Sequence, residues 1–333
     1  MPTLSLLSRR RLPLVATALA LGLGAASNVQ AQSDWPSKPI RLIVTGPAGG
    51  TADALARLLA DGMQRALKQP VYVESKTGAS GAIGIHELKA SGKNGYSFLV
   101  IQDGAMSEAP VAQKVSYDPF KDVTPVAQLT RTGLVMVANT SQPYQNLPDF
   151  ISHARKQPNG VDFASYATGF KGHTSGMLLG QLSQTNLRHI GYKGSPPALV
   201  DLMGGHVPVM FDGTATSLPL IRSGKIRALA AVYPTRLKAL PDVPTFKELG
   251  YPQLAKPGWF AVWAHPQTPA AIQQKLREVT LAHFATPAVH EQLAVLGMEP
   301  GQASTQQEMV ADLQDASQKQ VALLKAIGYQ PEH

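Results

Sequence analysis

Two stretches of this sequence decide its fold: residues 40–53 (IRLIVTGPAGGTAD) and residues 161–173 (VDFASYATGFKGH). Each is typical of a β-strand that runs through a glycine-containing turn into the start of a helix. Glycine lets the backbone approach a bound molecule closely, and a helix N-terminus favours an anion through its unpaired N–H groups and partial positive charge. Taken alone, either stretch would be an ordinary βα turn. Together they predict a site that holds a small carboxylate from two sides.

Strand-like and helical patterns alternate along most of the chain. Helices between strands indicate parallel βαβ units, which bind ligands at the carboxyl ends of their strands, and so favour an α/β fold. From Thr51 the first helix places Leu55, Leu59 and Met63 on one apolar face. The strands expected from the sequence are 40–45, 70–75, 97–102, 133–138, 161–166, 187–192, 207–212, 226–232 and 259–264.

The C-terminal third has the signals of consecutive helices. Thr268 and Thr286 each precede a proline, a pattern typical of an N-cap followed by the first helical residue. Gly297 is expected to end the second of these helices. Residues 305–308 (TQQE) match a capping box and predict a last helix that ends near Ile327.

The first 31 residues have the pattern of a cleavable export signal. Arg9, Arg10 and Arg11 are followed by an apolar stretch at 12–26, and small residues lead to an expected cleavage after Ala31. The apolar stretch has about 15 residues, fewer than the roughly 20 that span a bilayer. The arginine pair also resembles a twin-arginine signal, so the export route stays open. We expect the mature chain to reside in the periplasm without membrane insertion.

Composition excludes several classes of site. The chain has no cysteine, which excludes disulfides, thiolate metal sites and cysteine nucleophiles. Its net charge is +8, and the three arginines of the leader account for part of this, leaving +5. The remaining basic residues are scattered, which argues against nucleic acid and suits attraction of small anions. The length is enough for two domains with cores of their own.

Several segments in order resemble the Bug family, the TctC-type receptors of tripartite tricarboxylate transporters. The resemblance covers essentially the whole mature chain, and it rests on more motifs than chance would produce. The segments are 35–41 (WPSKPIR), 47–53 (PAGGTAD), 76–84 (KTGASGAIG), 117–119 with 123–127, 164–173, 192–199 (YKGSPPAL), 204–205 with 210–212, 224–230 and 240–245 (LPDVPT).

This resemblance implies a two-domain, type II periplasmic-binding-protein fold that closes on its ligand like a Venus flytrap. The expected first lobe is discontinuous and holds 35–131 plus 234–333, and the second lobe holds 132–233. The implied function is capture of a small organic acid and delivery to the membrane permease subunits of a tripartite tricarboxylate-type transporter. We expect a monomer that is not an enzyme and needs no cofactor or metal.

The resemblance also implies a ligand carboxylate held largely by loop backbone and bridging waters. The residues expected to bind it come from both loops and from the end of a later strand: Gly46, Ala48, Gly49, Gly50, Thr51, Asp53, Thr168, Gly169, Phe170, Lys171, His173 and Asp212. Three departures leave the identity of the ligand open. Ala48 and Ala52 stand where the family commonly has proline and threonine, and residues 170–171 stand where it commonly has small or hydroxylated residues.

Four of these side chains have a second interpretation. Asp53 can cap a helix, Asp212 can order its own turn, and His173 can hydrogen-bond the backbone of its loop. Lys171 is expected either near the mouth of the cleft, where its ammonium would favour a ligand with a second anionic group, or turned outward into solvent.

Other functions lack their sequence signatures. Residues 78–84 form GxxGxxG rather than the GxGxxG of dinucleotide-binding folds, and we expect them to line the ligand cleft instead. His283 and His290 are separated by Pro287, and no HExxH motif occurs. The nucleophile elbow GxSxG of serine hydrolases is absent. A periplasmic hydrolase on the same frame, or a receptor that feeds a two-component signalling system, remains the alternative.

Overall fold

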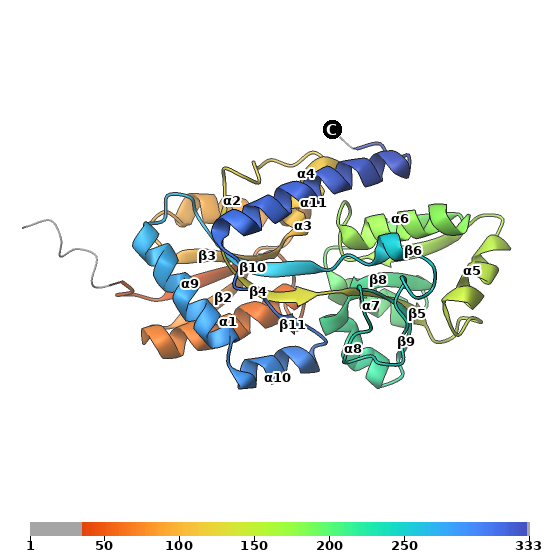
Figure 1. Cartoon of the computed structure of the whole chain (residues 1–333), viewed down its shortest axis with the longest axis horizontal. Helices are drawn as coiled ribbons and strands as arrows, with labels where there is room; N and C mark the ends of the chain where they lie inside the picture. Colours follow the sequence, from red (N-terminus) through yellow and green to blue (C-terminus); the bar gives the residue numbers. More distant parts are fainter. Residues whose placement is uncertain (1–34, 332–333) are drawn as a thin grey trace, which may run out of the picture. The chain divides into compact units, whose positions relative to one another are not determined.

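Two β-sheets organise the chain from Lys38 onward (Figure 1). The computed structural model describes residues 35–331, so the expected leader at 1–31 lies outside the described residues. Both sheets mix parallel and antiparallel strands, and helices lie between most successive strands, although β5 follows β4 directly. The α/β class that the sequence predicts is confirmed.

The first sheet is built from both ends of the chain. Its parallel part consists of β1, β2 and β3, and β10 pairs antiparallel with both β3 and β4. The strand order is β11-β4-β10-β3-β1-β2. The strands are β1 (Ile40–Val44), β2 (Val71–Ser75), β3 (Ser97–Gln102), β4 (Thr124–Thr132), β10 (Gly258–Ala264) and β11 (Glu299–Pro300).

The second sheet comes from one continuous stretch in the middle of the chain. Strands β6, β7 and β8 are parallel, and β5 pairs antiparallel with β8 and β9. The order is β7-β6-β8-β5-β9. The strands are β5 (Leu134–Asn139), β6 (Val161–Ser165), β7 (Leu187–Gly191), β8 (Val209–Gly213) and β9 (Ile226–Val232).

Helices cover both faces of each sheet. Helices α2, α3 and α11 pack on one face of the first sheet, while α1 and α9 pack on the other (Figure 1). In the second sheet α5 and α6 share one apolar core, and α7 and α8 share the other. The helices are α1 (Thr51–Leu67), α2 (Ala82–Ser91), α3 (Gly104–Ser107), α4 (Ala109–Ala112), α5 (Leu147–Arg155), α6 (Lys171–Ser183), α7 (Ser195–Met203), α8 (Thr214–Arg222), α9 (Ala270–Phe284), α10 (Pro287–Val295) and α11 (Gln306–Ala326), with short 3₁₀ turns at Ala79–Gly81 and Pro252–Leu254.

All nine expected strands are present, with ends within two residues of the predicted ones. The sequence did not predict β4, which begins with Thr124-Pro125 and carries the buried polar residues Gln128 and Thr130. Buried polar residues interrupt the apolar run that would predict a strand here. They are tolerated inside the protein because the neighbouring segment, rather than water, supplies their hydrogen-bond partners. Thr130 Oγ1 donates to the carbonyl of Glu299 at 2.5 Å, and the amide of Gln302 donates to Gln128 Oε1 at 3.2 Å.

Two of the expected helix caps are confirmed and one is wrong. Thr286 accepts from the amide of Val289, and Thr305 forms the complete capping box with Glu308. Thr268 does not cap α9. Its hydroxyl instead donates to the carbonyl of Gly92 at 3.0 Å and ties the segment to the end of α2.

Two segments expected in the first lobe pack against the second sheet. Phe246 and Leu254 are buried in the core that α5 and α6 share, and Leu237 in the core of α7 and α8. The end of α11 also reaches this sheet, because Leu323 packs on the α6 side of its core. Gln181 Nε2 of α6 donates to the carbonyl of Ala326 at 2.7 Å. The last helix therefore contacts both sheets.

Candidate functional site

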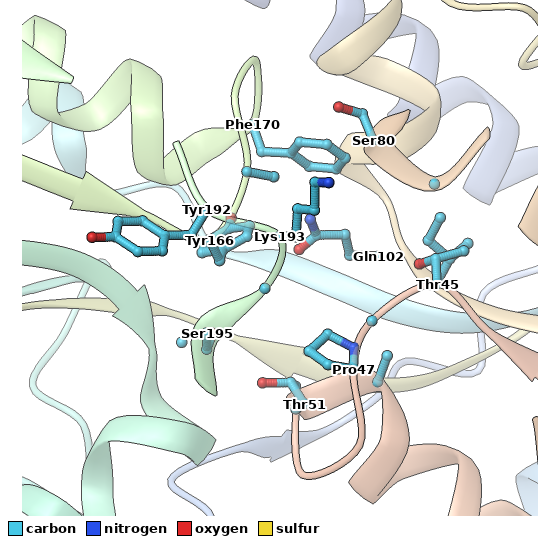
Figure 2. A pocket seen from close by; sticks show the side chains of 18 of the residues that line it. Thr45, Pro47, Thr51, Ser80, Gln102, Tyr166, Phe170, Tyr192, Lys193 and Ser195 are labelled. Atoms are coloured by element: carbon cyan, nitrogen blue, oxygen red, sulfur yellow. The ribbon is translucent and has the colours of Figure 1, made fainter. Parts of the chain in front are cut away.

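A cavity of about 370 Å³ lies where strands of both sheets end (Figure 2). It is in the range of about 300–1,000 Å³ that is usual for ligand pockets. The lining residues are Thr45, Gly46, Pro47, Gly50, Thr51, Ala52, Gly78, Ala79, Ser80, Gly81, Ile101, Gln102, Gln113, Thr132, Leu134, Tyr166, Ala167, Thr168, Phe170, Gly191, Tyr192, Lys193, Gly194, Ser195, Gly213 and Phe260.

The N-termini of four helices meet at this cavity, and each begins at a glycine. The N-cap residues of α1, α2, α7 and α8 are Gly50, Gly81, Gly194 and Gly213, and all four line the cavity. None of these N-caps has a side chain that accepts a hydrogen bond from its helix. The first N–H groups of a helix need an acceptor from elsewhere when the cap supplies none. The cavity is therefore surrounded by backbone donors and by the positive ends of helix dipoles.

The turn between β2 and α2 has an unusual backbone. Gly78, Ala79, Ser80 and Gly81 have consecutive positive φ values of 120°, 45°, 51° and 96°. Residues with side chains rarely adopt this conformation, and such strain concentrates at functional sites. The hydroxyl of Ser80 accepts a hydrogen bond from Gln113 Nε2. This contact holds Ser80 on the cavity wall.

Asp212 supports the second-sheet side of the cavity from behind. Its buried carboxylate accepts hydrogen bonds from Ser195, from Thr216 at 2.6 Å and from Ser217 at 2.7 Å. Burial raises the pKa of Asp212, and the three hydroxyl donors oppose that shift. The carboxylate thus fixes Ser195, the first residue of α7, at the cavity wall.

Loops of the two sheets touch across the cavity. A Cβ added to Gly194 would lie 2.5 Å from Cδ of Pro47, and one added to Gly213 would lie 3.2 Å from the hydroxyl of Thr51. Gly194 also has φ +107° and ψ 168°, a region that is essentially restricted to glycine. The approach of the two loops depends on the absence of side chains at these positions.

The structure brings five of the twelve predicted site residues to the cavity wall. Gly46, Gly50, Thr51, Thr168 and Phe170 line it. In the described part of the chain, the other predicted residues, Ala48, Gly49, Asp53, Gly169, Lys171, His173 and Asp212, lie outside the lining.

Two of these residues instead hydrogen-bond the backbone of their own loops, at 46–53 and 168–173. Asp53 Oδ2 accepts from the amide of Gly49 and from Nε of Arg57, both at 3.0 Å. Burial would raise the pKa of Asp53, but these two donors lower it below its usual value. His173 Nδ1 accepts from the amide of Gly169 at 3.1 Å. The interpretation of Asp53 and His173 as loop-ordering residues agrees with this geometry.

Lys171 takes neither of the two positions expected for it. Its side chain is only 17% exposed, and its ammonium lies 3.5 Å from Glu108 Oε1 and donates to the carbonyl of Pro257 at 3.2 Å. Burial would lower the pKa of Lys171, but the charges of Glu108 and Asp103 raise it above its usual value. These two carboxylates, far away in sequence, hold the ammonium, and Lys171 is not among the residues that line the cavity.

The buried His173 and the half-buried His189 of the second sheet stack on one another. The ring centroids of His173 and His189 are 4.0 Å apart, and His189 Nε2 lies 2.7 Å from the hydroxyl of Ser165. Burial lowers the pKa of His173 to about 4. Burial and the neighbouring His173 lower the pKa of His189 to about 3. Both rings are therefore neutral at pH 7. For His173 this agrees with its hydrogen bond, because Nδ1 must be unprotonated to accept from the amide of Gly169.

A family model described as the tripartite tricarboxylate transporter family receptor, TctC, matches residues 55–329. The chain belongs to this family. A curated relative, protein BugT of Bordetella pertussis, is 36% identical over 283 residues, which cover 83% of this chain and 85% of that protein.

Solved structures of other family-like proteins superpose on this chain. The periplasmic binding protein BugD has a TM-score of 0.83 at 31% identity, and the match covers 89% of this chain and 99% of that one. A Rhodopseudomonas palustris protein with adipate has a TM-score of 0.86 at 30% identity, and the match covers 90% of this chain and 100% of that one. MatC from the same organism, with bound malate, has a TM-score of 0.81 at 27% identity, and the match covers 87% of this chain and 99% of that one. These matches confirm the periplasmic-binding-protein fold.

Within residues 35–331, no helix combines the length and apolar character that a bilayer span requires. The same residues contain no group of three or more histidine and acidic side chains arranged to hold a metal ion.

The sequence did not predict most of the polar side chains at the cavity, including Gln102, Tyr192, Lys193 and Ser195. Three of them had a signal in the sequence. Residues 187–195 have the same strand, glycine and helix-start pattern as the two loops that were used to predict the site. Gln102 had no such signal, because its position depends on the pairing of β3 with β1. Ser80 lies in the 78–84 glycine loop, which the sequence places at the cleft.

Proposed function

We propose that this chain is a non-catalytic periplasmic receptor that captures a small carboxylate in the cavity between its two sheets. It would deliver this ligand to the permease subunits of a tripartite tricarboxylate-type transporter. Small carboxylates are also what the titles of two similar structures name, adipate in one and malate in the other.

The observation that carries the proposal is the convergence of four glycine-capped helix N-termini on one cavity. Helices α5, α10 and α11 provide the contrast, since their N-caps Asn146, Thr286 and Thr305 each satisfy a backbone amide of their own helix. Those three N-caps lie outside the described lining of the cavity. The helices that lack a side-chain cap at the cavity leave their first amides for a ligand with acceptor oxygens, and a carboxylate supplies both the acceptors and the negative charge.

We propose that the lobes follow the two sheets. The first crossing then falls at 132–133, between β4 and β5, next to the expected boundary between 131 and 132. The second crossing would fall at 255–257, rather than at 233, because Leu237, Phe246 and Leu254 pack against the second sheet. The ligand would be enclosed when loops such as those at Pro47 and Gly194 approach one another, and released when they separate.

The test is a binding experiment on the purified mature protein. Thermal unfolding is measured with a panel of adipate, malate, hexanoate and benzoate, with 1,6-diaminohexane as a cationic control. A carboxylate at 100 times its Kd should stabilise the protein by about 2.7 kcal/mol. Calorimetry should give one site per chain, and chromatography should recover the compound unchanged. Conversion of the compound would instead support the hydrolase alternative, and stabilisation by the diamine alone would contradict an anion site.

A further inference from the structure

The loop that leads into α6 of the second sheet packs into the core of the first sheet. Phe170, only 3% exposed, belongs to the apolar core that also holds Ala105 of α3 and residues of β1 and β3. A Cβ added to the preceding residue, Gly169, would lie 3.1 Å from Cβ of Ala112 in α4. Contacts this close form only while the two sheets are near one another, so this loop joins them on the side of α3 and α4.

Helix α6 receives its anion from the protein itself. Its N-cap, Phe170, supplies no side-chain acceptor, as at the four helices around the cavity. Here, however, the carboxylate of Glu108 accepts from the amide of Lys171, the first residue of α6, at 2.7 Å. An acid at a helix N-terminus is stabilised by the unpaired N–H groups and by the helix dipole. Glu108 therefore does for α6 what the proposed function expects a ligand carboxylate to do for the helices at the cavity.

Opposite charges on the two sides strengthen this contact. The side chain of Glu108 is 8% exposed, and the Lys171 ammonium lies 3.5 Å from its second oxygen. Asp103 of the first-sheet side lies near the same ammonium, because a Cβ added to Gly258 would be 3.0 Å from Asp103 Oδ1 and 3.5 Å from Lys171 Nζ. Separation of the sheets here would remove the cation from two acids that stay on one side, and like charges repel one another.

We propose that Glu108 is an internal carboxylate that holds the two sheets together without a ligand. It sets the fraction of the empty protein that has the closed arrangement, in which the loops meet across the cavity. The apparent affinity for any ligand of the closed arrangement falls in proportion to that fraction, so the contact acts on all such ligands equally. The inference goes beyond the proposed receptor function, and only its effect on affinity rests on that function.

The test measures the separation of the two sheets in the purified mature protein without ligand. Because the chain has no native cysteine, Ala66→Cys in α1 and Val200→Cys in α7 provide one exposed spin-label position on each side. Both helices begin at the cavity, so opening should lengthen the distance between the labels. Double electron–electron resonance is recorded for this labelled protein with and without Glu108→Gln. Glu291→Gln is the matched control, because Glu291 is exposed on α10 and its loss changes the net charge equally.

The expected result is a larger population at the longer distance in ligand-free Glu108→Gln than in the labelled wild type or in Glu291→Gln. The double variant Glu108→Gln/Lys171→Met leaves neither charge of the pair unmatched, which protects the comparison against a single variant that folds poorly. It should also be more open than the wild type, but less so than Glu108→Gln. By calorimetry, Glu108→Gln should weaken the binding of adipate and of hexanoate by the same factor, at least about threefold.

Two outcomes would overturn the inference while leaving the receptor function intact. One is an identical ligand-free distance distribution in the wild type, Glu108→Gln and the double variant. The other is a changed ratio of the adipate and hexanoate affinities in Glu108→Gln, because the carboxylate would then act on the ligand rather than on closure. If the wild-type protein binds no carboxylate, the proposed function fails, whereas the ligand-free distances still decide the role of Glu108.

Discussion

The backbone amide of Lys171 donates to Glu108 Oε2 at 2.7 Å, and its ammonium lies 3.5 Å from the other oxygen of the same carboxylate. Lys171 begins α6 of the second sheet, whereas Glu108 follows α3 beside the first sheet. One carboxylate therefore caps a helix and neutralises a cation across the boundary between the two sheets. This pairing makes Lys171 a structural residue.

Lys171→Met should destabilise the protein without changing ligand selectivity. The substitution leaves the mostly buried Glu108 carboxylate without its cation, and breaking such a pair costs about 3–5 kcal/mol. Denaturant unfolding measures the loss, and calorimetry with adipate and hexanoate measures selectivity. The double variant Lys171→Met/Glu108→Gln is the control, since it removes both charges and should recover part of the stability. A single variant as stable as the wild type would show that the pair contributes nothing.

His173 should make stability depend on pH between about 4 and 6.5. Its folded pKa of about 4 lies below that of an unfolded histidine, near 6.5, so the unfolded chain binds more protons in this window. Its contribution is complete above pH 6.5 and is lost as the pH falls toward 4, by about 1.4 kcal/mol per pH unit.

The variant His173→Asn isolates this contribution, because the amide oxygen of asparagine can still accept from Gly169 but does not titrate in this range. The difference in unfolding free energy between wild type and variant should shrink as the pH is lowered from 6.5 to 4. The exposed residue His290 supplies the control variant His290→Asn. If the unfolding free energies of wild type and His173→Asn changed equally with pH, the low pKa assigned to folded His173 would be contradicted.

Gly50→Val should weaken ligand binding more than it weakens the fold. Gly50 has an extended backbone, with φ −79° and ψ 169°, which valine can adopt. The new Cβ would lie 3.1 Å from the carbonyl of Pro47, and the side chain would occupy space at the N-terminus of α1. We expect an affinity loss of at least about tenfold by calorimetry. Ala48→Val adds similar bulk to an exposed position of the same loop and should bind normally.

Gly194→Ala should hinder closure of the cavity. The added methyl group would lie 2.5 Å from Cδ of Pro47 on the opposite loop, so the two loops could not approach as they do here. Small-angle scattering should show that saturating ligand reduces the radius of gyration of the wild type but reduces that of the variant less. Gly250→Ala is the control for backbone strain, because Gly250 has φ +90° with no atom within 4 Å of an added Cβ. Identical radii for wild type with and without ligand would refute closure on binding.

The strands and the glycine loops could be predicted from the sequence because their signals are local. Short apolar runs mark β1 and β6, and glycines followed by helical patterns mark where α1 and α6 begin. The position of Lys171 could not be predicted in this way. Its partner Glu108 is 63 residues earlier, between two four-residue helices that have no periodic pattern of their own.

The packing of β4 and of the 237–254 segment also depends on distant partners. Phe246 is buried under the second sheet because Ala231 of β9 and Thr245 form an isolated parallel bridge beside it. A pairing of this kind leaves no periodic pattern in the sequence. Lys193 differs from these residues, since its loop repeats the glycine pattern and could have been recognised by the same reasoning.

The last helix places a constraint on how the two sheets can move. The chain passes between them at β4–β5 and again before β10, and two neighbouring crossings allow rotation about the line that joins them. Helix α11 adds a third attachment, because Gln320 Nε2 donates to the carbonyl of Gly169 at 3.4 Å and Tyr329 packs edge-on against His173. The two sheets can rotate relative to one another only if α11 bends or its contacts with Gly169 and His173 change. Under the proposed receptor function, separation of the sheets to release a ligand would break these contacts at residues 320–329.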